Sequence, residues 1–274
     1  MIDYIKKKLE KRKLKRTFSE YGHTMKSFDL EKTGKVNYAQ WNHPFEGEKE
    51  ISQGQVDFFS ELLKDGEFGI DIGAHTGDTT VPMALAAGAG GMVLGLEPNP
   101  YVFKILEVNA AQNKDKSNIK PVCYAATDED GTFTFQYSDA SFCNGGYLDH
   151  IESTNHRHNF TLDVKGKNLE NVLRKEYANE LPKLSLIKVD AEGYDKEILK
   201  SLKGIIAEYK PNLLVECYKR LTEAERDDLY NTIVDMGYDL YYIDGFEAGN
   251  TRERLSKSDM SNRKHFEMMA KPIK

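Results

Sequence analysis

Residues 71–80 read D-I-G-A-H-T-G-D-T-T and overlap the end of a short apolar run, F-G-I-D-I at 68–72. The run predicts a buried strand that ends at a glycine-containing loop, and the hydroxyl groups and Asp78 predict a helix start after it. Strand, loop and helix in this order are typical of α/β proteins that bind a nucleotide. Gly73 and Gly77 would let the backbone turn tightly and approach a ligand closely.

The loop departs from the pattern that binds a pyrophosphate. Such loops read G-x-G-x-x-G, whereas this one reads G-x-x-x-G and is preceded by Asp71. A carboxylate beneath the loop is a poor neighbour for a phosphate and a good one for a cation. Glu97 ends the next apolar run, where a carboxylate can accept both hydroxyls of a ribose. S-adenosylmethionine carries a ribose and a sulfonium but no phosphate, so the pattern favours this cofactor over NAD.

Further apolar runs predict strands along the rest of the chain, at 91–97, 119–125, 184–190, 212–218 and 238–244. Helices are predicted between them, at 101–113, 168–180, 195–208 and 222–236. The last helix starts with a capping box, Thr222 to Glu225, and ends at Gly237. This alternation predicts an α/β fold with a mostly parallel sheet and helices on both faces.

Two segments depart from the alternation. Residues 131–164 contain two β-like runs around a polar stretch, which predicts an inserted β-hairpin or lid. Residues 1–60 form an N-terminal extension in which 17–60 show no clear sheet pattern, so the main domain is expected at 61–274. Within the extension, residues 29–40 resemble a calcium loop but end in Gln40 where a bidentate glutamate is required, so an ordinary turn is expected.

Charge is unevenly distributed. Residues 1–16 carry eight Lys or Arg and two acidic residues, whereas the whole chain has a net charge of −6. The acidic body argues against a nucleic-acid partner. Ile2, Ile5 and Leu9 fall at helical spacing, which favours a solvated helix that packs these residues on the body. Weak peripheral contact of this helix with anionic lipid or a partner is the alternative.

The composition is that of an enzyme-sized globular chain. It has 274 residues, 39% of them hydrophobic, which is enough to bury one substantial core. Three cysteines stand without a C-x-x-C pair, which fits a reducing compartment. Because the chain shows neither an apolar signal-peptide core nor a run of about 18 apolar residues, we expect a cytoplasmic protein without a membrane span.

Four strings in the chain resemble the FkbM family of S-adenosylmethionine-dependent methyltransferases: DIGAHTGD (71–78), LEPNP (96–100), LIKVDAEG (186–193) and LVE (214–216). The resemblance covers roughly residues 60–245. It implies a Rossmann-like class I methyltransferase fold with a seven-stranded sheet, O-methylation of hydroxyls on sugars or natural products, and a donor site at the first two strings. Asparagine commonly occupies the position of His75 in such proteins.

The expected donor site comprises the first loop, the end of the second strand and one later residue: Asp71, Gly73, His75, Thr76, Gly77, Thr79, Thr80, Glu97, Pro98, Asn99 and Ala126. His75 would take the place of the asparagine amide and bind the methionine carboxylate or its water. A role as a base towards the substrate hydroxyl, or simple capping and packing, remains open for this imidazole.

Asp190 and Glu192 are the candidate catalytic residues, for positioning the substrate or for removing its proton. Lys188 lies two residues before Asp190 on the same strand face, so it could instead neutralise a buried carboxylate. Glu216 should end the neighbouring strand and face the same cleft. It is expected to bind substrate together with Asn144 of the insert, where a plain turn is an equal alternative.

No metal site is expected. Asp190 and Glu216 could hold Mg²⁺, but two carboxylates without a third ligand are not enough. A polar loop contains three histidines but no nearby thiolate, which disfavours zinc: His150, His156 and His158.

The combined interpretation is a cytoplasmic O-methyltransferase that acts on a small-molecule or sugar acceptor held beneath the 131–164 lid. Tyr137 and Tyr147 of this insert could stack on such a ring. The alternatives are an NAD-type oxidoreductase, which the absent G-x-G-x-x-G pattern disfavours, and a non-catalytic binding module that retains the fold. The sequence indicates no oligomeric state.

Overall fold

The computed structural model describes residues 2–143, 145–148 and 160–273. Side chains are described over the same ranges except at 2–7, 147 and 148. Several residues considered above therefore lie outside the described part, as whole residues or as side chains: Ile2, Ile5, Asn144, Tyr147, His150, His156 and His158.

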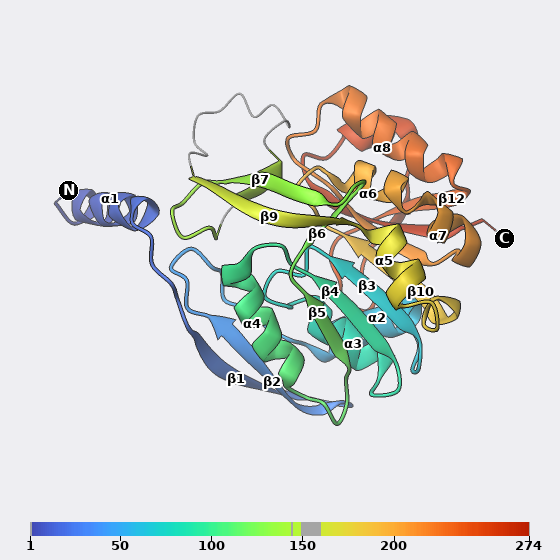
Figure 1. Cartoon of the computed structure of the whole chain (residues 1–274), viewed down its shortest axis with the longest axis horizontal. Helices are drawn as coiled ribbons and strands as arrows, with labels where there is room; N and C mark the ends of the chain where they lie inside the picture. The colour runs from blue at the N-terminus through green and yellow to red at the C-terminus, as the bar shows by residue number, and fades with distance from the viewer. Residues whose placement is uncertain (1, 144, 149–159, 274) are drawn as a thin grey trace.

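A central sheet forms the core of the described chain (Figure 1). Its order is β13-β12-β14-β11-β10-β3-β4-β5. Five neighbouring strands are parallel: β3 (Phe68–Ile72), β4 (Met92–Leu96), β5 (Ile119–Val122), β10 (Leu184–Val189) and β11 (Asn212–Cys217). The antiparallel strand β14 (Phe266–Pro272) lies between β11 and β12 (Tyr238–Ile243), and β13 (Arg252–Arg254) forms the edge. The prediction of a mostly parallel sheet is confirmed.

The sheet has eight strands rather than the seven expected. The additional strand is β13, whose three residues are too few to show an alternating pattern in the sequence. The seventh strand, β14, completes the expected set, although the sequence pattern did not predict its position. It lies between two strands that precede it in the chain, so its pairing is a long-range contact that local periodicity does not encode.

Helices cover both faces of the sheet, as predicted. Two of them, α2 (Gln53–Leu62) and α3 (Thr80–Ala87), pack on the face that carries Leu186 and Leu214. Four pack on the opposite face: α5 (Leu169–Glu176), α6 (Asp195–Ser201), α7 (Lys203–Tyr209) and α8 (Glu223–Asp235). The apolar residues of successive strand positions alternate between these two layers, which is why the parallel strands read as continuous apolar runs.

Three helix predictions need correction in length. The helix predicted at 168–180 ends at Glu176 and is followed by a short 3-10 turn, η1 (Leu181–Lys183). The helix predicted at 195–208 is two helices, α6 and α7, which meet at Leu202. The others fit within two residues: α4 spans Pro100–Ala111, and α8 has the expected Thr222 capping box. A second 3-10 turn, η2 (Lys257–Ser261), precedes β14.

A second, four-stranded sheet lies over one end of the central sheet (Figure 1). Its order is β6 (Ala125–Thr127), β9 (Phe160–Asn168), β7 (Gly131–Tyr137) and β8 (Gly145–Leu148). The expected hairpin is present as the antiparallel pair β7 and β8, but β9 and β6 extend it. The strand predicted at 119–125 is therefore divided, because β5 belongs to the central sheet and β6 to the second.

The N-terminal extension contains a β-hairpin, β1 (His23–Leu30) and β2 (Gly34–Trp41), so the absence of a sheet pattern at 17–60 was a wrong prediction. β1 is largely exposed, which leaves no alternation to detect. The turn between Leu30 and Gly34 lies inside the calcium-like segment, in agreement with the ordinary turn expected there. β2 packs against α4, so the hairpin belongs to the body.

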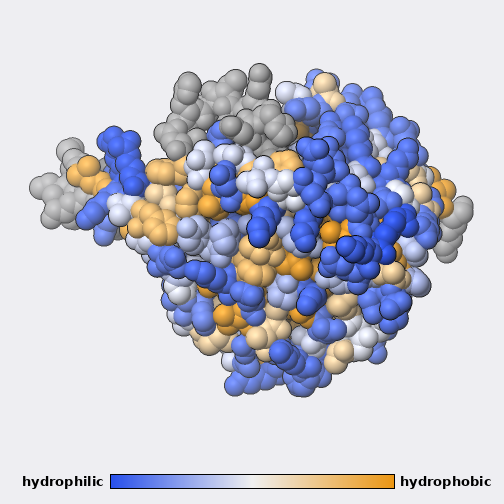
Figure 2. All heavy atoms as spheres, viewed as in Figure 1, coloured by the Kyte–Doolittle hydropathy of each residue, from blue (hydrophilic) through white to orange (hydrophobic). Residues whose placement is uncertain are grey.

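The basic N-terminus forms α1 (Ile2–Arg16), which extends from the body beside β1 (Figure 1). The expectation that Leu9 packs on the body is wrong, since its side chain is 60% exposed. Contact is confined to the end of the helix, where the Lys15 carbonyl accepts a hydrogen bond from Ala140 N–H and two lysines lie over the Phe45 ring. Hydrophilic residues dominate the visible face of the molecule (Figure 2). None of the described helices is long and apolar enough to cross a membrane.

Candidate active site

A cavity of about 520 Å³ opens at the carboxyl ends of β3, β4 and β10, where the second sheet covers them. This volume is typical of a small-molecule or cofactor site. Nine residues singled out from the sequence line it: Gly73, His75, Thr79, Glu97, Pro98, Asn99, Ala126, Asp190 and Glu192. Five others do not belong to its lining: Asp71, Thr76, Gly77, Thr80 and Glu216.

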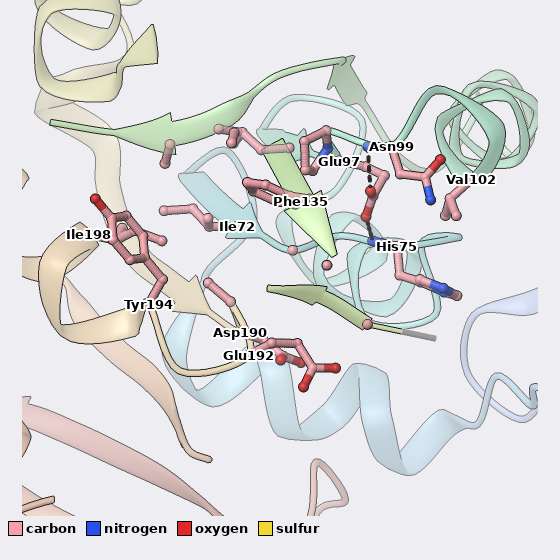
Figure 3. Close-up of a pocket in the computed structure, with 18 of the residues that line it drawn as sticks. Ile72, His75, Glu97, Asn99, Val102, Phe135, Asp190, Glu192, Tyr194 and Ile198 are labelled. Carbon is pink, nitrogen blue, oxygen red and sulfur yellow. Dashed lines mark hydrogen bonds between the residues drawn. The ribbon is translucent and has the colours of Figure 1, made fainter. Parts of the chain in front are cut away.

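The carboxylate of Glu97 is fixed by two backbone groups (Figure 3). Oε1 accepts a hydrogen bond from Asn99 N–H at 2.8 Å and Oε2 accepts one from His75 N–H at 3.0 Å. Burial raises the pKa of Glu97, while the nearby His75 and the two backbone donors oppose this shift. Each oxygen keeps a further lone pair, so the carboxylate can still accept two hydroxyl groups in the cavity.

His75 has a left-handed backbone, with φ of 49°. Asparagine, aspartate and histidine tolerate this conformation better than most other non-glycine residues. The imidazole is about one third exposed and lines the cavity, and its Nδ1 lies 3.9 Å from Oε1 of Glu46. Its ring also contacts Trp41 edge-on. The residue therefore has two parts: a backbone that holds Glu97 and a side chain that faces the cavity.

Asp71 lies beneath the loop and is fully buried. Its Oδ2 accepts hydrogen bonds from the hydroxyls of Thr79 and Thr80, at 2.9 and 2.6 Å, and its Oδ1 lies 3.2 Å from Lys188 Nζ. Burial lowers the pKa of Lys188, but the carboxylates of Asp71 and Asp190 outweigh burial and raise it. The cation that Asp71 meets in the structure is therefore Lys188, and the aspartate secures the start of α3.

The two loop glycines are needed for packing within the protein. At Gly73, with φ of 82°, a Cβ atom would lie 1.9 Å from the backbone oxygen of Asp190. At Gly77, with φ of 96°, it would lie 3.0 Å from a methyl group of Leu106. Gly73 thus lets the loop pass directly beside the end of β10, and only this glycine reaches the cavity.

Thr76 joins the loop to the N-terminal hairpin. Its hydroxyl forms a hydrogen bond of 2.7 Å with Tyr38 Oη, and its carbonyl accepts one from Asn109 Nδ2 at 2.7 Å. Burial raises the pKa of Tyr38, so the phenol keeps its proton. This residue is fully buried and acts in the packing of the extension against the body.

Asp190 and Glu192 follow β10 and lie at the other side of the cavity from Glu97 and Asn99 (Figure 3). Asp190 Oδ2 lies 3.4 Å from Lys188 Nζ. Burial and the charge of Asp190 raise the pKa of Glu192. Asp195 holds this turn, since its carboxylate accepts hydrogen bonds from Ala191 N–H and Gly193 N–H.

Glu216 ends β11, next to β10, as expected, but its carboxylate lies away from the cavity lining. It is buried beside His265 and Glu267 of the antiparallel strand. Burial and the charge of Asp190 raise the pKa of Glu216 to about 10. The sequence could not reveal this neighbourhood, because β14 was not predicted.

Sequence reasoning missed several cavity residues. Glu46 and Lys49 come from the N-terminal extension, and Lys49 Nζ lies 2.7 Å from Asp78 Oδ2. Burial raises the pKa of Asp78, but Lys49 and His75 outweigh it, so the pKa is lowered. From the second sheet, Phe135 joins Tyr137, the latter already considered as a stacking residue. No motif marks these residues, because the fold alone brings their segments to the cavity.

Comparison with known proteins was made on this geometry. The model of the methyltransferase FkbM domain matches residues 71–240, more than half of the chain. A search of the curated proteins finds no match.

Three of the similar solved structures illustrate the range. The methyltransferase FkbM from Methylobacillus flagellatus KT is 15% identical, with 78% of this chain and 50% of that chain covered and a TM-score of 0.46. An S-adenosylmethionine-dependent O-methyltransferase from Thermotoga maritima is 11% identical, with 89% and 76% covered and a TM-score of 0.42. A precorrin-6y C5,15-methyltransferase from Geobacter metallireducens GS-15 is 13% identical, with 79% and 87% covered and a TM-score of 0.41.

The domain match begins at Asp71, at the loop beside the cavity, and extends through the strands that carry Glu97, Asp190 and Glu216. It includes the four strings on which the resemblance was based. The central sheet also has the mostly parallel α/β architecture that the resemblance implied. The chain therefore belongs to the FkbM family of S-adenosylmethionine-dependent methyltransferases.

Proposed function

We propose that this chain transfers a methyl group from S-adenosylmethionine to a hydroxyl oxygen of a small molecule or sugar. The observation that carries the proposal is the cavity with Glu97 fixed on one side and Asp190 and Glu192 on the other. One side suits a ribose and the other suits a group that loses a proton.

The donor end of the cavity fits a nucleoside. Glu97 would accept the two ribose hydroxyls through the lone pairs that its backbone contacts leave available. Apolar walls from Leu96, Val102 and Phe135 stand next to it and suit a flat purine ring. The imidazole of His75 would bind the methionine end. S-adenosylmethionine supplies an electrophilic methyl group when bound.

The acceptor end would be formed by Asp190 and Glu192 beneath the second sheet. In the transfer, the acceptor oxygen forms a bond to the methyl carbon while the carbon–sulfur bond breaks, and the hydroxyl proton passes to a carboxylate. The products are a methyl ether and S-adenosylhomocysteine. Alignment of the two reactants can contribute about 7–11 kcal/mol, and a general base a further factor of about 10²–10⁴.

Donor binding is tested by calorimetric titration with S-adenosylmethionine, S-adenosylhomocysteine and NAD⁺. We expect both adenosyl ligands to bind and Glu97→Gln to weaken them by about tenfold or more, since one hydrogen bond to a charged group contributes about 1.5–3 kcal/mol. Glu107→Gln, on the exposed surface of α4, is the matched control and should bind as the parent does. Binding of NAD⁺ in place of the adenosyl ligands would overturn the proposal.

Turnover is tested by release of S-adenosylhomocysteine with a panel of hydroxylated acceptors that begins with sugars. Asp190→Asn and Glu192→Gln should lower kcat for an active acceptor, by about 10²–10⁴ for the base, while the donor affinity changes little. Equal kcat values in both variants would exclude a base from this pair. Donor binding with no turnover on any acceptor would instead favour a non-catalytic module.

A further inference from the structure

Two glutamates face each other across the antiparallel strands β11 and β14. Glu216 and Glu267 are direct Cα partners, so their side chains project from the same face of the sheet. His265 comes just before β14. One ligand atom from each of these three residues lies within 4.8 Å of the other two. Within the described part of the chain, this is the one such group of three potential metal ligands.

Like charges directly opposite each other on antiparallel strands destabilise a sheet. Here the side chain of Glu216 is only 7% exposed, and its Oε2 has no hydrogen-bond partner among the described residues. Oε1 lies 3.4 Å from His265 Nδ1. A buried carboxylate oxygen without a partner is costly, so the site has an unsatisfied need for a cation or donor.

The nearest buried lysine does not meet this need. Lys188 lies on the same sheet face, but its Nζ is 3.2 Å from Asp71 and 3.4 Å from Asp190. Asp190 therefore pairs with Lys188 and is not part of the group of three, which also excludes the Mg²⁺ site first considered between Asp190 and Glu216. One buried lysine thus stands against four carboxylates along this face.

We propose that Glu216, His265 and Glu267 bind a divalent first-row transition-metal ion. An imidazole and two carboxylates suit Zn²⁺ or Mn²⁺, whereas Mg²⁺ and Ca²⁺ prefer oxygen ligands alone. Ligand bonds of about 2.0–2.3 Å require the three ligand atoms to approach one another slightly. His265 is about half exposed, so its ring is free to adjust and solvent has access to complete the coordination.

The ion would neutralise the facing glutamates and join β14 to β11 at the end of the sheet nearest Asp190. This inference does not rest on the methyl-transfer proposal, because none of the three ligands belongs to the cavity lining. Binding of the metal and binding of the donor are therefore separate measurements, and either can fail without the other.

The experiment is a titration of the metal-free protein with Mn²⁺, followed by electron paramagnetic resonance, and with Zn²⁺ by competition. We expect one saturable site per chain, with Ca²⁺ and Mg²⁺ at least about tenfold weaker. His265→Gln and Glu267→Gln should each weaken Mn²⁺ by about tenfold or more, since even second-shell losses cost that much. His23→Gln and Glu129→Gln, both at exposed positions, are the matched controls and should bind normally.

Glu216→Gln guards against a result caused by misfolding. Removing the buried charge should raise the Tm of the metal-free protein, while the additional rise in Tm caused by Zn²⁺ in the parent protein should disappear. Absence of saturable binding, unchanged affinity in His265→Gln and Glu267→Gln, or Ca²⁺ binding as tight as Mn²⁺ binding would each overturn the proposed site.

Discussion

The backbone N–H of His75 donates a hydrogen bond to Oε2 of Glu97 at 3.0 Å, so the first loop orients the carboxylate that ends the next strand. The contact requires His75 to adopt φ of 49°. The residue commonly asparagine in this family is therefore one that must tolerate a left-handed backbone, and histidine meets that requirement.

His75→Asn should leave the free energy of unfolding within about 0.5 kcal/mol of the parent, whereas His75→Val should lower it by about 1–2 kcal/mol. A β-branched side chain crowds the left-handed conformation, and the loop that holds Glu97 would shift. Urea denaturation measures the stability, and titration with S-adenosylmethionine should show weaker binding for the valine variant. Equal behaviour of the two variants would mean that backbone conformation is not what this position demands.

Gly73→Ala should lower the free energy of unfolding by about 1–3 kcal/mol and weaken donor binding, because its Cβ would lie 1.9 Å from the Asp190 carbonyl oxygen. Gly90→Ala is the matched control. A Cβ at Gly90 meets nothing within 4 Å, so this variant should stay within about 0.5 kcal/mol. Denaturation and calorimetry together check both effects. Similar losses in the two variants would refute the close approach.

Lys188→Met should destabilise the protein by about 3–5 kcal/mol, because it leaves Asp71 buried without its cation. The double variant Asp71→Asn with Lys188→Met should recover part of this loss, since the unpaired charge is gone. Lys183→Met removes a lysine that is half exposed and should cost about 0–1 kcal/mol. A double-mutant cycle from denaturation data checks the coupling, and strict additivity would contradict it.

Stability should fall as pH rises through the neutral range. Burial, together with the charge of Asp190, raises the pKa of Asp195 from 3.8 to about 8. Between these values the folded protein holds a proton that the unfolded chain has released, so unfolding becomes more favourable as pH increases. One such group contributes a slope of at most about 1.4 kcal/mol per pH unit.

Asp195→Asn should reduce this slope, measured as the free energy of unfolding from pH 5 to pH 8. It should not abolish the slope, because Glu216 and Glu267, with pKa values raised to about 10 and about 7 by burial, contribute in the same direction. A slope unchanged in the variant would show that Asp195 is ionised throughout the range.

The parallel core of the fold was readable in the sequence. The strands β3, β4, β10 and β11 are buried on both faces and therefore appear as continuous apolar runs. The capping box at Thr222 marked the start of α8 for a local reason of the same kind. β1 was missed because its exposure removes the alternation on which prediction depends.

The candidate site was readable only in part. Glu97, Asp190 and Glu192 follow predicted parallel strands, whose carboxyl ends meet at one edge, so their convergence on a cavity could be foreseen. The positions of Asp71 and Glu216 could not. Each ends or follows a strand in the same way, but what their carboxylates meet depends on Lys188 and on β14, which belong to other segments.

The sequence alone determined the alternating α/β architecture, the family and the loop geometry around Gly73 and His75, because these depend on short-range periodicity and local backbone preferences. Only the tertiary structure decided that Glu46 and Lys49 of the extension line the cavity and that Glu216, His265 and Glu267 gather outside it. Such groups form between segments far apart in the chain, and their energies of burial and charge exist only after those segments have packed together.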